Sequence, residues 1–148
     1  MKLSKGFEQA IYVILILEIK GQGQPVKSTV LSHELQVSDS SLKKVLRKLV
    51  LAGLIKSVAS KDGGFMLARP IENISLRDVL IGEEGTQPIQ FKNHHLARQI
   101  FDYQQERDHI AYSERLIDQS LTGATDAYEE ALSHFTLDRL LKKNQKSN

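Results

Sequence analysis

The stretch between positions 38 and 48 concentrates hydroxyl and cationic side chains that can bind phosphates and the edges of bases. Its members are Ser38, Ser40, Ser41, Lys43, Lys44, Arg47 and Lys48. Serine and lysine suit contacts to phosphate oxygens, and an arginine can bind guanine through two parallel hydrogen bonds. The serines have no histidine or lysine at a spacing that would make them nucleophiles. This chemistry predicts double-stranded DNA as the ligand of the stretch.

The helix that would carry these side chains can be predicted from the spacing of apolar residues. Such residues recur every three or four positions between residues 42 and 50, so Ser38 is expected to cap a helix that continues to Ala52. Gly53 is expected to end this helix in a left-handed conformation. Two more helices are predicted upstream, at Phe7–Ile19 and Ser28–Leu35.

The periodicity then changes to that of a β-hairpin. Two short apolar segments, Leu54–Val58 and Phe65–Ala68, flank a loop in which Asp62-Gly-Gly64 is expected to supply positive φ angles. Three short helices followed by a hairpin are typical of a winged helix-turn-helix, so the predicted fold is mainly α with a small β-hairpin. The remaining predicted DNA contacts are Ser60 and Lys61 in the loop and Lys5 near the start of the chain.

Charge divides the chain into a basic and an acidic half. Residues 1–70 hold eleven basic and five acidic residues, a net charge of +6, whereas residues 71–148 hold nine and thirteen, a net charge of −4. This asymmetry predicts a DNA-binding half and a helical half for dimerisation and sensing. The polar stretch Gly82–Pro88, which contains glycine and proline, is the expected hinge, so the predicted domains are residues 1–82 and 83–148. Helices are expected at Leu76–Ile81, His94–Leu121 and Thr125–Leu141, the last two separated by a break near Thr122-Gly123.

An apolar stripe at three- and four-residue spacing near the C-terminus is the predicted homodimer interface. It comprises Ala127, Tyr128, Ala131, Leu132 and Phe135. The acidic half suits this role because DNA would repel it. The alternative is that the stripe packs only against its own domain.

Several other classes of function find no support in the sequence. The absence of cysteine excludes disulfides, thiol catalysis and cysteine-ligated zinc or iron–sulfur clusters. His94, His95 and His109 are not spaced as metal ligands, and no phosphate loop or dinucleotide motif is present. The longest apolar run, Ala10–Leu17, is too short to cross a bilayer, which takes about 20 residues. We therefore expect a cytoplasmic protein that is not an enzyme and needs no metal or cofactor.

Five segments of the chain resemble the IscR/NsrR/CymR-type winged-helix regulators. They are Met1–Lys5, Leu46–Val58, Gly63–Pro70, Ile74–Leu80 and Phe135–Leu141. The resemblance implies a dimer whose C-terminal helix pairs across a two-fold axis. Several such proteins sense iron–sulfur clusters through three cysteines that would lie between residues 85 and 110, and this chain has none. It resembles a cysteine-free branch, whose signal is a small-molecule effector or a partner protein.

Two departures from that family concern the predicted DNA contacts. Ser41 and Lys43 stand where an aromatic and an acidic residue are common, and Ala59 stands where the wing usually carries arginine. Operator preference therefore does not carry over from relatives. The expected function is a transcription regulator, a repressor, that binds a palindromic operator as a homodimer. The alternative is a protein-interaction module that keeps the winged fold but binds a partner protein instead of DNA.

Overall fold

The structure is a computed structural model that describes residues 2–145. The chain divides into two compact units. The first contains the residues up to Thr86 together with those from Ala131 onward, and the second is Gln87–Glu130. The boundary at Thr86 lies within the stretch Gly82–Pro88 that the sequence predicts as a hinge. The residues from Ala131 onward belong to the first unit, whereas the sequence places them in a separate domain that begins at residue 83.

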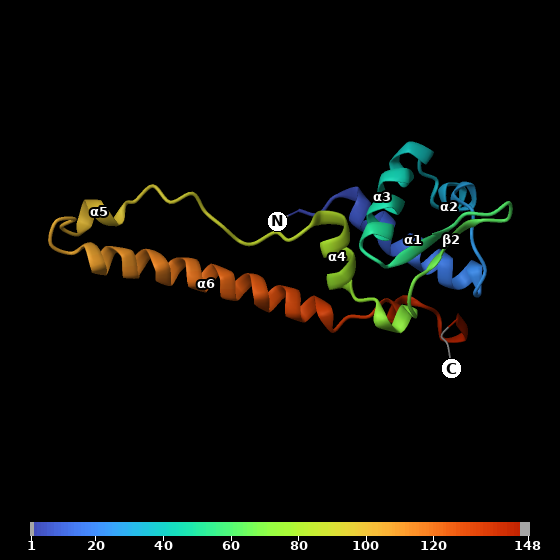
Figure 1. The fold of residues 1–148 in the computed structure, drawn as a ribbon. Helices are drawn as coiled ribbons and strands as arrows, with labels where there is room; N and C mark the ends of the chain where they lie inside the picture. The colour runs from blue at the N-terminus through green and yellow to red at the C-terminus, as the bar shows by residue number, and fades with distance from the viewer. Residues whose placement is uncertain (1, 146–148) are drawn as a thin grey trace. The chain divides into compact units, whose positions relative to one another are not determined.

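The first unit has the predicted winged helix-turn-helix architecture (Figure 1). Three helices precede a two-stranded antiparallel sheet, and a short 3₁₀ turn and a fourth helix follow it. The elements are α1 (Lys5–Gly21), α2 (Ser28–Leu35), α3 (Asp39–Leu51), β1 (Ile55–Val58), β2 (Gly64–Leu67), η1 (Ile71–Asn73) and α4 (Leu76–Glu84). The fold class, mainly α with a small β-hairpin, is confirmed. No helix among the described residues is long and apolar enough to span a membrane.

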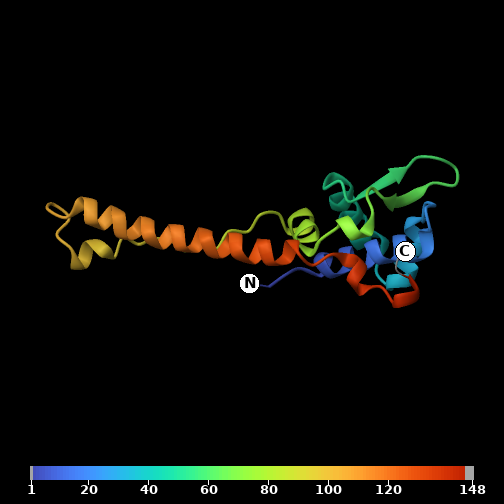
Figure 2. The ribbon, with the colours of Figure 1, turned by 90° about the horizontal axis from the view of Figure 1, so that it is seen from below.

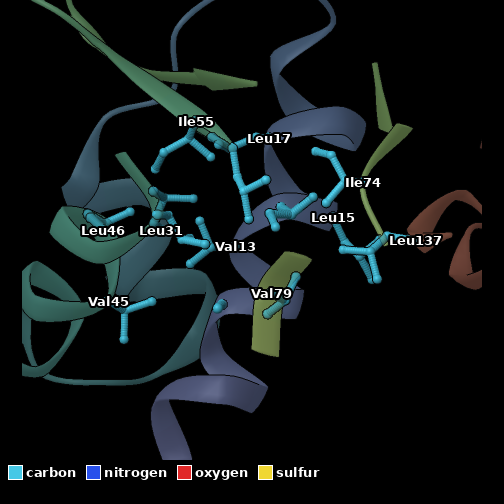
Figure 3. Close-up of a cluster of buried hydrophobic side chains, with 14 of the residues drawn as sticks. Val13, Leu15, Leu17, Leu31, Val45, Leu46, Ile55, Ile74, Val79 and Leu137 are labelled. Atoms are coloured by element: carbon cyan, nitrogen blue, oxygen red, sulfur yellow. The ribbon is translucent and has the colours of Figure 1, made fainter. Parts of the chain in front are cut away.

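The core of this unit surrounds α1, which is apolar around most of its circumference (Figure 3). Val13 and Ile14 of α1 have no exposed surface. Most other elements of the unit contribute buried side chains to the same cluster, including Leu31, Val45, Leu46, Ile55, Ile74, Val79 and Leu137. Burying one such side chain contributes about 1.5–3 kcal/mol. This shared core holds α3 and the hairpin in a defined relation to each other.

The hairpin, or wing, pairs Ile55 with Leu67 at one end and Val58 with Gly64 at the other. Its connecting loop extends beyond the helices in two orthogonal views (Figure 1 and Figure 2). The prediction that Gly63 and Gly64 supply positive φ angles is wrong, because neither is among the residues with positive φ. Both are needed for close backbone approach instead. A Cβ on Gly64 would lie 2.4 Å from the carbonyl oxygen of Val26, and one on Gly63 would lie 2.0 Å from that of Val58.

The close approach at Gly64 joins the wing to the chain that enters α2. The backbone N–H of Val26 donates to the carbonyl of Phe65 at 2.9 Å, and the N–H of Phe65 donates back to Val26 at 2.8 Å. This pair of bonds forms a one-residue bridge beside the two-stranded sheet. The base of the wing is thereby attached to the helix-turn-helix by backbone contacts as well as by the core.

The predicted helices of the C-terminal half are wrong in their boundaries. The structure has a four-residue helix, α5 (Ala97–Ile100), and one continuous helix, α6 (Arg107–Ser133), with no break at Thr122-Gly123. An interior glycine costs a helix only about 1 kcal/mol relative to alanine, which the turns on either side of Gly123 outweigh. The helix ends before Phe135, so the last part of the predicted helix to Leu141 is replaced by a 3₁₀ turn, η2 (Leu137–Leu140). A second 3₁₀ turn, η3 (Lys143–Gln145), follows it.

The segment after α6 packs against the start of α4 in the first unit. Leu76 N–H donates to the carbonyl of Phe135 at 2.9 Å, and Leu137 N–H donates to that of Ile74, also at 2.9 Å. Ser75 and Thr136 form an antiparallel bridge between these contacts. Leu137 has no exposed surface. The C-terminal segment is therefore part of the winged-helix core.

In the second unit, an extended segment runs along one side of α6. Ile89 N–H donates to Thr125 Oγ1 at 2.8 Å, and Tyr128 Oη donates to the carbonyl of Gln87 at 2.7 Å. Nearer the start of α6, Asn93 Nδ2 donates to Glu114 Oε2 at 3.0 Å. These contacts attach the extended segment to one side of α6 at Glu114, Thr125 and Tyr128.

Candidate nucleic-acid interface

Local signals set the start and the end of α3. Ser38 occupies the N-cap position, and its Oγ accepts a hydrogen bond from the N–H of Ser41 at 3.2 Å. This bond satisfies one of the N–H groups that have no partner within the helix. Gly53, just beyond the C-cap, has a φ of +74°. Both predictions, the serine cap and the left-handed glycine, are confirmed.

Packing decides which side of α3 is exposed. Leu42, Val45, Leu46 and Leu49 are buried against the core. All ten side chains that the sequence predicts as DNA contacts are exposed, including the seven between positions 38 and 48. Seven lie on α3 or its cap, two lie in the wing loop, and Lys5 begins α1.

The exposed cations of α3 lie on two flanks of the helix. Lys43 and Arg47 line a pocket of about 550 Å³ that also contacts Ser28 of α2 and Phe65 of β2. Sequence reasoning missed Ser28 and Phe65, because only the packing of α2 and the hairpin in the folded unit brings them beside α3. This flank of α3 therefore faces the wing.

The other flank of α3 carries Lys44 and Lys48, which line a second pocket with Ser40 and Ser41. Lys48 Nζ donates to the main-chain carbonyl of Glu83 at 3.1 Å. Within residues 2–145, no hydrogen bond or ion pair engages Lys43, Lys44 or Arg47. Three cations on α3 thus have no partner among the described residues, whereas Lys48 already donates one hydrogen bond to Glu83.

The second pocket also contains an acidic residue that sequence reasoning missed. Glu83 of α4 is only 5% exposed, and its Oε1 is buried without a hydrogen-bond partner. Burial raises the pKa of the Glu83 carboxyl to about 7, against the opposing effect of Lys48. One signal in the sequence could have identified it. Leu76, Val79 and Leu80 are apolar positions of α4, and Glu83 continues their three- and four-residue spacing onto the buried side.

The neighbouring Glu84 has a structural role. The backbone N–H of Ser4 donates to Glu84 Oε1 at 2.8 Å, and the Ser4 hydroxyl donates to the same oxygen. These two bonds hold the pKa of Glu84 below its usual range. They tie the residue before α1 to the end of α4, on either side of the pocket that Glu83 lines.

The comparisons with known proteins agree with this geometry. The model of the Rrf2 family, described as "Iron-dependent Transcriptional regulator", matches residues 3–143. The chain belongs to the Rrf2 family. Over 85 residues this Rrf2 protein is 44% identical to YffB of Lactococcus lactis and 42% identical to YwgB of Bacillus subtilis. Each match covers 57% of the chain and 54% of the relative, so it spans about half the length of these proteins.

More distant matches extend over nearly the whole chain. The HTH-type transcriptional regulator NsrR of Oceanobacillus iheyensis is 23% identical over 146 residues, which is 98% of this chain and 92% of that protein. CymR, the global cysteine regulator of B. subtilis, has a similar fold, with a TM-score of 0.67 at 20% identity over 95% of both chains. T. potens IscR matches with a TM-score of 0.63 at 20% identity, over 100% of this chain and 93% of its own. The family and these relatives are regulators, not enzymes.

The residues of this Rrf2 protein do not fit the iron centre that the family description implies. The sequence contains no cysteine. Across the part of the chain that the structure describes, no group of three or more histidines and carboxylates is arranged to hold a metal ion. His95 Nδ1 lies 3.4 Å from Glu114 Oε1, but these two side chains form a pair without a third ligand. The described residues therefore offer no ligand set for an iron centre.

The predicted dimer residues fall on different surfaces of this Rrf2 protein. Ala127 and Ala131 are exposed, and they continue a row of exposed small and apolar residues along α6, which we call the α6 stripe. Its members are Leu116, Ile117, Ala124, Ala127 and Ala131. Tyr128 and Leu132 are half-buried on the adjacent side of α6, and Phe135 lies beyond the end of the helix.

Proposed function

We propose that this Rrf2 protein is a repressor that binds a palindromic DNA operator as a homodimer, without an iron–sulfur cluster. The observation that carries the proposal is the set of unengaged cations on α3, next to a wing whose loop adds Ser60 and Lys61. An exposed helix of this kind fits the major groove, which presents a different pattern of donors and acceptors for each base pair. The basic charge of residues 1–70 supports the same proposal.

Each group has a distinct role in the proposed complex. Arg47 reads a base, because its guanidinium can form two parallel hydrogen bonds with guanine. Lys43 and Lys44 bind phosphates on the two sides of the groove, since they lie on opposite flanks of α3. Ser60 and Lys61 contact the backbone or the adjacent minor groove through the wing loop.

The α6 stripe supports the homodimer. Its side chains are apolar yet exposed, with Leu116 at 44% and Ile117 at 49%. Pairing two copies of this surface would remove it from water, and small residues such as Ala124 and Ala127 would allow two helices to approach closely. A two-fold dimer places two α3 helices on half-sites one helical turn apart, about 34–36 Å, or a multiple of that spacing.

A fluorescence anisotropy titration tests the proposed function. The full chain is titrated with the duplex that flanks its own gene and with a random duplex of the same length. Tighter binding to the flanking duplex, followed by reduced run-off transcription from it, is expected. Absence of binding to both duplexes at 50 mM salt would contradict DNA recognition and favour docking to a partner protein. Increased transcription would contradict the repressor assignment.

Arg47→Ala is expected to weaken operator binding by about 1–3 kcal/mol and to relax preference at one operator position, because it removes a bidentate base contact. Arg47→Lys is the matched control, since it keeps the charge but cannot form the paired bonds. It should retain affinity for random duplex while losing preference at that position. If Arg47→Ala weakens binding equally on every sequence, Arg47 is a phosphate contact and the base-reading role is wrong.

Ala131→Glu is expected to shift the protein from dimer to monomer, because it places an unpaired charge within the paired α6 stripes. Operator affinity should fall sharply while the winged helix stays folded. Ala111→Glu is the matched control: Ala111 is also exposed on α6 but lies off the stripe. Light scattering at micromolar concentration measures the molar mass and so distinguishes monomer from dimer. An Ala131→Glu protein that remains fully dimeric would place the interface elsewhere.

A further inference from the structure

We propose that the pocket between the start of α1, the outer flank of α3 and the end of α4 is an effector site for a small zwitterion, with the ligand's ammonium group on Glu83 and its carboxylate or phosphate on Lys44. This inference rests on the proposed function and extends it, because the ligand would occupy side chains that otherwise bind DNA. The pocket lies wholly within the first unit and has a volume of about 390 Å³. That volume is at the lower end of the range for small-molecule sites.

The acidic side of the site is Glu83. Its side chain lines the pocket and is only 5% exposed, and within residues 2–145 its Oε1 is buried without a hydrogen-bond partner. Lys48 bonds to the main-chain carbonyl of this residue, and Ser4 bonds to the neighbouring Glu84. A buried carboxylate without donors is unfavourable, so such groups normally have partners. A ligand with an N–H group would supply the hydrogen-bond donor that Glu83 Oε1 lacks.

The cationic side of the site is formed by α3. Lys44 lines the pocket and has no partner among the described residues, and Lys48 uses one of its three donors on Glu83. Ser40 and Ser41 add hydroxyl groups to the same wall. A ligand with only a positive charge would be repelled by the two lysines, and one with only a negative charge would leave Glu83 unsatisfied. A zwitterion matches both groups.

Gly6 leaves room for the ligand at the base of the pocket. A Cβ at this position would lie 3.5 Å from Glu83 Oε2 and 3.6 Å from Val45 Cγ2, which are ordinary contact distances. Alanine would therefore fit without a clash and would occupy space beside the carboxylate. Gly6 lies in the first turn of α1, where alanine also has the higher helix propensity.

Ligand binding would oppose DNA binding through shared side chains. Lys44 is a proposed phosphate contact, Ser40 and Ser41 are predicted DNA contacts, and all three line the pocket. An anionic group bound to Lys44 competes directly with a phosphate for the same ammonium. The ligand thus releases the repressor from its operator without any change in the fold.

The test uses thermal unfolding and DNA anisotropy of the full chain with a panel of the proteinogenic amino acids and phosphoethanolamine. Acetate, inorganic phosphate and ethylamine serve as controls that carry only one of the two charges. At about ten times its Kd, a zwitterion from the panel should raise the Tm by roughly 3–5 °C and lower DNA affinity by about tenfold. The single-charge controls should do neither.

Two variants locate the binding. Gly6→Ala and Glu83→Gln should each abolish the ligand-induced rise in Tm, and Gly6→Ala should keep the wild-type DNA affinity in the absence of ligand. Glu72→Gln, at an exposed acid elsewhere in the unit, should respond as wild type does. If no zwitterion shifts the Tm, or if both pocket variants still respond, the proposed site is wrong. A ligand response without any DNA binding would instead contradict the proposed function and leave the site standing.

Discussion

The affinity of the protein for its operator is expected to fall by about 10³ or more when the salt concentration rises from 50 to 200 mM. The reason is counterion release: each phosphate neutralised by a cation frees counterions from the DNA, and a dimer that makes ~6–10 such contacts has a steep salt dependence. The cations are Lys43, Lys44 and Arg47 on α3, Lys61 in the wing loop and Lys5 on α1, present twice in a dimer. Anisotropy titrations at several salt concentrations give the slope.

Two lysines on the same flank of α3 make this prediction residue-specific. Lys44 is unengaged, whereas Lys48 already donates to the carbonyl of Glu83. The salt slope is the steepness with which the logarithm of the binding constant falls against the logarithm of the salt concentration. Lys44→Ala should therefore reduce this slope by about one for each phosphate that it leaves without a cation, and Lys48→Ala should reduce it less. A slope near zero for the wild type would contradict DNA binding and favour the protein-docking alternative. Equal effects of the two variants would contradict the unequal roles of the two lysines.

Leu137→Ala is expected to destabilise the protein by about 2–5 kcal/mol, because it leaves a cavity in the shared core of the winged helix. Leu137 follows α6 in the chain, yet it has no exposed surface and belongs to the core cluster, in a 3₁₀ turn that packs against α1 and η1. Its N–H also donates to Ile74 at 2.9 Å, so the segment is anchored by its backbone at the same point. Urea unfolding monitored by circular dichroism measures the change in the free energy of unfolding.

Leu140→Ala is the matched control for this substitution. Leu140 lies in the same 3₁₀ turn but is 44% exposed, so its truncation should cost only a fraction as much. Equal destabilisation by the two substitutions, or less than about 1 kcal/mol for Leu137→Ala, would show that the C-terminal segment is not part of the winged-helix core. The unfolding transition should keep its steepness if the substitution affects only packing in the core.

Local signals explain why so much of the winged helix could be predicted. The spacing of buried residues in α3, the Ser38 cap and the left-handed Gly53 are properties of a few neighbouring residues, and each acts at its own position. The same holds for the change from helical to strand periodicity at the wing. The exposed side of α3 then follows, because the residues that are not needed for the core must face water.

The sequence by itself determined the three helices, the hairpin and the exposed cations of the first unit, since hydrophobic periodicity and capping specify them locally. Only the tertiary structure decided that Leu137 returns to that unit and that Lys48 lies beside Glu83. The tertiary structure also decided that the backbone of Val26 lies so close to Gly64 that a Cβ would not fit there. These features depend on contacts between residues that are at least 35 positions apart in the chain. Local propensity depends only on neighbouring residues, so it cannot predict such contacts. At Gly123, the modest cost of a glycine in a helix is outweighed by the helical turns on either side.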